Sequence, residues 1–166
     1  MKKNLLGVVT VILWCNLSFQ HKPKPPNILF ITIDDLRPEL GCYGKPYIIS
    51  PNIDRLASEG QLFENHFVAV PTCGASRHTL LTGRYPRNAS NLSNDASANA
   101  FEKPVKSNTP ETFVHLLKQN NYHTVGIGKI SHYPEGRVYP YDESPEKARL
   151  ELPLSWDEMI LNTGKW

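Results

Sequence analysis

A continuous apolar segment near the start of the chain, Asn27–Ile33, constrains the fold more than any other feature. Its sequence, NILFITI, is rich in β-branched residues and lacks the alternation of a half-buried strand. Such a run is typical of a strand buried on both faces, as in a parallel sheet. It ends at Asp34 and Asp35. Because ligands gather at the carboxyl ends of such strands, and adjacent carboxylates are costly to bury unpaired, a site is expected there.

The rest of the chain alternates predicted helices with predicted strands, which together predict an α/β fold. The expected helices are 51–58, 76–82 and 111–120, and the further expected strands are 62–70 and 123–130. The polar stretch 90–100 is expected to be a surface loop. The segment 133–166 shows little regular periodicity.

Local signals support two of the predicted helices. Ser50 can cap the first helix, Pro51 suits its first turn, and Gly60 can close it. Gly83 is the expected stop of the second helix.

The first 20 residues are typical of a secretory signal peptide, because two lysines precede an apolar run, Leu5–Trp14. The alternatives are a buried N-terminal strand or a short membrane anchor. Cys15 also permits a lipoprotein, although the bulky Trp14 before it disfavours that processing. A proline-rich tether, residues 21–26, follows. The protein is therefore expected to be secreted or periplasmic.

The charge balance argues against nucleic acid as a partner. The chain has 18 basic and 16 acidic side chains, and two of the basic ones, Lys2 and Lys3, lie in the predicted signal peptide. Without that peptide the chain is neutral, and it has no basic stripe of the kind that binds phosphate backbones.

Cys73 is the candidate nucleophile. It lies near the start of a predicted helix, and Arg77 follows one turn later. A helix N-terminus and a nearby cation both favour the thiolate. The alternatives are a small buried thiol, the commoner fate of a lone cysteine, or a disulfide with Cys42 in an oxidising compartment.

The segment Pro71–Arg84, PTCGASRHTLLTGR, resembles the signature of the sulfatase family. In that signature a cysteine is followed two positions later by Pro or Ala, then by Ser and Arg, and further on by Leu-Leu-Thr-Gly. Ala75 stands where most members have proline, and Gly74 occupies a variable position. The family oxidises this cysteine to formylglycine with a dedicated maturation enzyme.

Other segments resemble the same family in the same order. The run 26–35 is similar to its first strand with two metal-binding aspartates. The blocks 36–44 and 50–57 are similar to iduronate-2-sulfatase-like members, and Lys129 and His132 match a lysine and a histidine of that subgroup. The resemblance implies an alkaline-phosphatase-like fold with a mostly parallel sheet flanked by helices.

The resemblance also implies a chemistry and a set of roles. Asp34 and Asp35, with the formylglycine made from Cys73, would bind Ca²⁺, which prefers hard oxygen ligands. A hydroxyl of the hydrated aldehyde would attack sulfur with help from the cation and Arg77. Lys129 would clamp the sulfate. His132 would be the base that lets sulfate depart. The implied substrates are sulfate esters, with sulfated glycans the expected class.

Each of these residues also has an ordinary structural interpretation. The two aspartates could cap a helix and pair with Arg37, and Lys129 and His132 could be a solvated strand end. Three further polar residues are not assigned to the site: Arg84, Cys42 and His66.

Sulfatases are several-fold longer than this sequence, and the resemblance implies further metal ligands, a second histidine and a second lysine downstream. Residues 27–166 are therefore expected to be the N-terminal part of a catalytic domain, inactive and poorly soluble on its own. The alternatives are a truncated non-catalytic product and a phospho-ester hydrolase of the same superfamily. Phosphatases of that superfamily use Ser or Thr without the sulfatase signature, which disfavours the second alternative.

Overall fold

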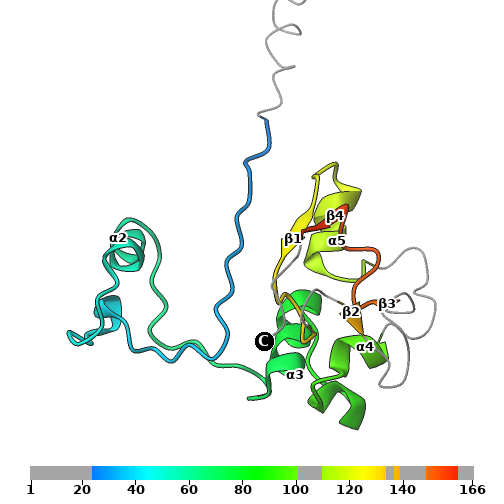
Figure 1. Ribbon diagram of the computed structural model, residues 1–166, viewed down its shortest axis with the longest axis horizontal. Helices are drawn as coiled ribbons and strands as arrows, with labels where there is room; N and C mark the ends of the chain where they lie inside the picture. Colours follow the sequence, from blue (N-terminus) through cyan, green and yellow to red (C-terminus); the bar gives the residue numbers. More distant parts are fainter. Residues whose placement is uncertain (1–23, 101–109, 134–136, 139–148, 161–166) are drawn as a thin grey trace, which may run out of the picture. The chain divides into compact units, whose positions relative to one another are not determined.

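The computed structural model describes residues 24–100, 110–133, 137–138 and 149–160, and Figure 1 shows their elements. The predicted signal peptide, Cys15 and the first part of the tether lie outside these ranges. The chain divides into two units, Met1–Thr32 and Ile33–Trp166. No helix in the described part is long and apolar enough to cross a membrane.

Short helices and short strands make up the described part of the second unit. The helices are η1 (Gly41–Tyr43), α2 (Pro51–Glu59), α3 (Cys73–Thr82), η2 (Ala89–Leu92), α4 (Ala96–Ala100) and α5 (Phe113–Gln119). The strands are β1 (Val125–Ile127), β2 (Arg137–Val138), β3 (Arg149–Leu150) and β4 (Glu158–Ile160).

Helix α2 confirms the first predicted helix and is one residue longer at its end. Pro51 occupies the first turn, where its missing N–H costs nothing. Ser50 precedes the helix as predicted, but its hydroxyl caps no helical N–H. It donates instead to Asp54 Oδ1 at 3.0 Å and accepts from Gly41 N–H, which ties α2 to η1.

Helix α3 begins at Cys73, three residues before the predicted 76–82, and ends at Gly83 as expected. Gly83 adopts φ 65°, a left-handed conformation that glycine takes without a steric penalty. Helix α5 lies within the predicted 111–120, and the Thr112 side chain caps it by accepting from His115 N–H. The buried residue of α5 is Val114.

The strands form two pairs. β1 and β4 are parallel, with Gly126 opposite Met159, and β2 and β3 are antiparallel. β1 lies inside the predicted strand 123–130. Helices and a parallel strand pair agree with an α/β fold at this coarse level, while the large sheet implied by the resemblance is not formed among the described residues.

A small core joins α3, α5 and the segment before β4, which lie close together in Figure 1. Its buried members are Leu81, Val114 and Leu152, with Phe113, Ile130 and Trp156 packed against them.

Two predicted strands are wrong for this structure. Residues 27–33 and 62–70 carry no strand, and many of their apolar side chains are exposed, with Leu29 at 85% and Phe67 at 84%. An apolar run becomes a strand only when its backbone joins a ladder, and the ladders of the described residues are β1–β4 and β2–β3. Composition alone did not determine the pairing.

The predicted loop 90–100 is also wrong, because it contains the end of η2 and all of α4. Its alanines explain the difference, since alanine has the highest helix propensity. Ala96, Ser97 and Ala98 are buried in α4. This packing brings the preceding residue pair, Asn94 and Asp95, close to the start of α3.

Candidate active site

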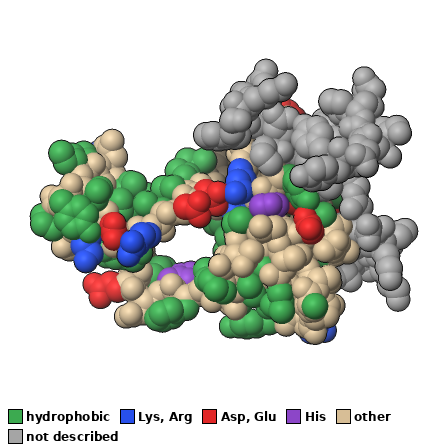
Figure 2. Space-filling model, turned by 60° about the horizontal axis from the view of Figure 1, so that its bottom comes forward, with side chains coloured by type: hydrophobic (Ala, Val, Ile, Leu, Met, Phe, Trp, Pro, Cys, Tyr) green, Lys and Arg blue, Asp and Glu red, His purple; other side chains and the backbone are tan. Residues whose placement is uncertain are grey.

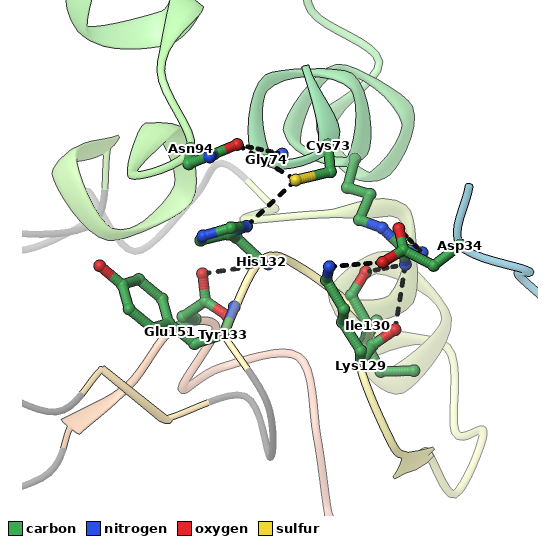
Figure 3. Close-up of polar contacts among 10 residues, drawn as sticks. Asp34, Cys73, Gly74, Asn94, Lys129, Ile130, His132, Tyr133 and Glu151 are labelled. Carbon is green, nitrogen blue, oxygen red and sulfur yellow. Dashed lines mark hydrogen bonds and ion pairs between the residues drawn. The ribbon is translucent and has the colours of Figure 1, made fainter. Parts of the chain in front are cut away.

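Cys73 is the first residue of α3, after Thr72 in extended conformation. It is half-buried and free, as is Cys42, so the structure holds no disulfide between them. Its Sγ lies 3.3 Å from His132 Nδ1 and 3.2 Å from Asn94 Oδ1, and Figure 3 shows both side chains pointing toward the sulfur. The structure thus brings together two residues predicted for the site, Cys73 and His132.

Arg77 lies one turn after Cys73 and is buried, at 8% exposure. Its guanidinium donates to the carbonyl oxygens of Lys129 and Ile130, both at 3.0 Å. It also donates to Asp34 Oδ1 at 3.1 Å. Arg77 therefore fixes the segment after β1 against α3, and that segment carries His132.

Asp34 is paired with two cations. Its second oxygen, Oδ2, accepts from Lys129 Nζ at 2.5 Å. The hydrogen bond from Lys129 lowers the pKa of Asp34 below its ordinary value, and the one from Arg77 acts in the same direction. The structure thus pairs Asp34 within the predicted site, whereas Arg37 pairs with Glu39. In the space-filling view acidic, basic and histidine side chains lie side by side on one face (Figure 2).

Lys129 reaches Asp34 because the chain turns directly after β1. Gly128 adopts φ 74°, which a side chain would disfavour. Lys129 and His132 therefore lie beyond the end of β1, whereas the predicted strand, 123–130, had included Lys129. Neither is an isolated solvated side chain, since one contacts Asp34 and the other Cys73.

Burial favours the neutral form of His132. Desolvation lowers the pKa of His132 below its ordinary value, and the positive charge of Lys129 adds to this. A neutral imidazole with its proton on Nε2 presents Nδ1 as an acceptor toward Cys73 Sγ. His132 is thus suited to take a proton from the side chain at position 73.

Glu151, which the sequence analysis missed, holds the His132 segment in place. Its buried carboxylate accepts from the Ser131 hydroxyl, from Tyr133 N–H at 3.0 Å and from His132 N–H at 3.5 Å. Burial raises the pKa of Glu151, and these hydrogen bonds oppose that shift. Three consecutive residues are therefore anchored by one side chain from the segment after β3.

Tyr133 adds a second connection. Its hydroxyl donates to Asp95 Oδ1 at 2.5 Å, and its ring lies edge-on to the His132 ring, with centroids 5.1 Å apart. The His132 segment is thereby tied to the Asn94–Asp95 pair. No motif in the sequence marks Asn94 or Glu151, because both are polar residues in segments without periodicity.

The three residues that the sequence left unassigned have other surroundings. Cys42 N–H donates to Asp54 Oδ1 at 2.7 Å within the η1–α2 pair, which is a structural contact. His66 is exposed and meets the Phe63 ring edge-on. Arg84 is exposed just after α3.

The acidic pair fits a calcium site in donor type but not in donor number. Asp34 and Asp35 offer the hard oxygen ligands that Ca²⁺ prefers, yet Ca²⁺ takes six to eight oxygens. Within the described ranges no three His, Cys, Asp or Glu side chains are grouped so that they could hold a metal. Asp35 is exposed at φ 52°. The two aspartates can hold part of a calcium shell, and further ligands must come from elsewhere.

Comparison with known families decides the classification. The model of the family described as "Sulfatase" matches residues 26–156, which include every residue of the site described above. The chain belongs to the sulfatase family. This confirms the resemblance drawn from the Cys73 segment and the ordered motifs around it.

Curated sulfatases from animals and bacteria are similar to this chain. Mouse iduronate 2-sulfatase is 39% identical over 86% of the chain and 27% of its own length. Human N-acetylgalactosamine-6-sulfatase is 40% identical over 83% of the chain and 31% of its own length. An arylsulfatase of Clostridium perfringens is 38% identical over 66% of the chain and 22% of its own length. The chain therefore spans about a fifth to a third of the length of these sulfatases. No solved structure matches it significantly.

Proposed function

We propose that the protein carrying this chain hydrolyses sulfate esters, with formylglycine made from Cys73 as the nucleophilic residue. The observation that carries the proposal is the position of Cys73. It begins a helix, contacts His132 Nδ1 at 3.3 Å, and lies within the match to the sulfatase family.

The conversion of Cys73 is an oxidation. The Cβ–sulfur unit loses two electrons to an oxidant supplied by the maturation enzyme, and oxygen from water replaces sulfur, which leaves as hydrogen sulfide. The free, half-buried thiol is available for this change. When hydrated, the resulting aldehyde supplies a hydroxyl that can attack the sulfur of the ester.

The remaining residues of the site have distinct tasks. His132 accepts a proton at the place of Cys73 Sγ, because burial lowers the pKa of its imidazole and so favours the neutral form. Lys129 and Arg77 present positive charge where the sulfate oxygens would lie. Asp34 and Asp35 would hold part of a Ca²⁺ shell, and the cation supplies further charge neutralisation.

Lys129 must release Asp34 for this arrangement to work. In the structure its ammonium pairs with Asp34 Oδ2. If Asp34 were a Ca²⁺ ligand, Lys129 would lose this partner, and its ammonium could then contact the sulfate. Lys129 and the cation would thus share the Asp34 carboxylate, and a bound sulfate would give the Lys129 ammonium an alternative partner.

We further propose sulfated glycans as the substrate class and a secreted or periplasmic location. The names of two similar sulfatases, iduronate 2-sulfatase and N-acetylgalactosamine-6-sulfatase, refer to sugars. The location rests on the signal-like segment 1–20.

The test is an assay of the intact protein co-expressed with a formylglycine-generating enzyme. The panel pairs an aryl sulfate and sulfated disaccharides with the matching phosphate esters, and Ca²⁺ is present. Sulfate release that depends on the maturation enzyme is the expected result. Release of phosphate with no release of sulfate would contradict the proposal and favour the phospho-ester hydrolase.

A further inference from the structure

Asn94 contacts both the candidate nucleophile and the backbone of the first turn of α3. Its Oδ1 lies 3.2 Å from Cys73 Sγ and also accepts from Gly74 N–H at 3.2 Å. Because a backbone N–H can only donate, the amide must turn its oxygen toward it. The same oxygen therefore faces Sγ, as Figure 3 shows.

The backbone of Asn94, as well as its side chain, lies close to Gly74. A Cβ added to Gly74 would lie 2.1 Å from Asn94 O and 2.4 Å from Asn94 Cα. Only a glycine at position 74 permits this approach. Gly74, which occupies a variable position of the signature, thus permits Asn94 to lie this close to α3.

The acceptors around position 73 match a hydrated aldehyde better than they match a thiol. Asn94 Oδ1 is an acceptor that faces Cys73 Sγ, and His132 Nδ1 is a second acceptor in the tautomer that carries its proton on Nε2, whereas a thiol has a single S–H to donate. A hydrated aldehyde has two O–H groups. Water adds across its C=O bond, with the water oxygen bonding to carbon and a proton passing to the carbonyl oxygen. One hydroxyl of the hydrate can then donate to Asn94 Oδ1 and the other to His132 Nδ1.

We propose that Asn94 is a catalytic residue that holds one hydroxyl of the hydrated formylglycine at position 73, while His132 receives the other. The inference rests on the proposed function, because it requires the aldehyde. Asn94 favours the hydrate over the free aldehyde and orients the hydroxyl that it does not bind. Its loss lowers the population of the reactive form and leaves substrate binding by Lys129 and Arg77 in place.

The experiment compares variants of the intact protein after co-expression with the maturation enzyme. Asn94→Leu removes the acceptor at similar size, and Asn94→Asp keeps it. Gly74→Ala displaces the Asn94 backbone while its amide stays intact. Asn99→Ala, on the exposed side of α4, is the matched control. Mass spectrometry gives the converted fraction at position 73, and all rates are normalised to it.

The readout that separates this role from a merely structural one is the reaction of the aldehyde with an aminooxy reagent. Asn94→Leu and Gly74→Ala should react roughly two- to tenfold faster than wild type, since one hydrogen bond to the hydrate is lost. Their kcat should fall by about tenfold, with KM within about twofold. Asn94→Asp and Asn99→Ala should react at the wild-type rate.

Wild-type aldehyde reactivity and wild-type kcat in Asn94→Leu would overturn the inference and leave the proposed function standing. An unconverted wild-type Cys73 without turnover would overturn both. Thermal unfolding of each variant checks the fold. If Asn94→Leu melts early, Asn94→Asp is compared with Gly74→Ala, and equal aldehyde reactivity in those two would overturn the inference.

Discussion

Cys73 Sγ and His132 Nδ1 lie 3.3 Å apart, although 59 positions separate the two residues in the chain. Arg77 and Glu151 produce this contact by fixing the segment after β1 from two sides. Arg77 and Glu151 thus position the proton acceptor through the backbone and Ser131 side chain of its segment, not through the His132 imidazole. Substitutions at the contact and at its supports therefore have separable effects.

Replacing His132 should affect chemistry and leave maturation intact. His132→Ala and His132→Gln are expected to lower kcat by about 10²- to 10⁴-fold, the usual contribution of a positioned general base. Steady-state kinetics with an aryl sulfate measure this. His123→Ala is the control, since that exposed histidine pairs with Glu158 and should retain wild-type kcat. Equal losses in both variants would contradict the role of His132.

Replacing Glu151 should loosen the His132 segment. Glu151→Ala leaves Ser131 Oγ and two backbone N–H groups without their acceptor, at a cost of about 1–3 kcal/mol in unfolding free energy. Glu151→Gln keeps one acceptor oxygen and should cost less. Denaturant unfolding monitors stability, and kcat should fall more in the alanine variant. A glutamine variant as unstable as the alanine variant would argue against this anchoring.

Removing either aspartate of the acidic pair should abolish turnover and weaken Ca²⁺ binding. Asp34→Ala also leaves Arg77 and Lys129 without their carboxylate, whereas Asp35→Ala removes an oxygen ligand alone. Calorimetric titration with Ca²⁺ separates metal binding from catalysis. Glu64→Ala, at an exposed carboxylate, is the control. Near-normal activity in either aspartate variant would disprove its part in a calcium shell.

The Asp157 carboxylate should make stability depend on pH in the acid range. Thr124 N–H and the Lys118 ammonium lower the pKa of Asp157 from 3.8 to about 2. The folded state therefore releases this proton more readily than the unfolded state, and stability rises with pH between those two values. Wild type should exceed Asp157→Asn in melting temperature above about pH 4. This difference in melting temperature should shrink as pH falls to about 2. A difference that does not change with pH would contradict the proposed effect of Asp157.

Local sequence signals predicted helices better than strands. Pro51 and Gly83 marked helix ends that depend on the backbone of a few neighbours. The apolar run 27–33 needed partners in a ladder, and its sequence does not specify them. Helix α4 was missed because polar residues surround its alanines, and the stretch was therefore predicted to be a loop.

In the site, too, residues within local motifs were predicted, and residues that depend on distant contacts were not. Cys73, Arg77, Lys129 and His132 were predicted from motifs at fixed spacing, and the structure places all four in one connected set of contacts. Asn94 and Glu151 could not be predicted, because their roles depend on contacts that form only when the chain is folded. Asn94 depends on the close approach at Gly74, and Glu151 on the burial of its carboxylate.

The most direct test of the account is the mass of the tryptic peptide 56–77, which contains Cys73, from the intact protein made with the maturation enzyme. Conversion of thiol to aldehyde removes about 18 Da. This loss of mass should appear together with sulfate release, and Cys73→Ala should show neither. A fully unmodified thiol in a preparation that hydrolyses sulfate esters would contradict the central claim.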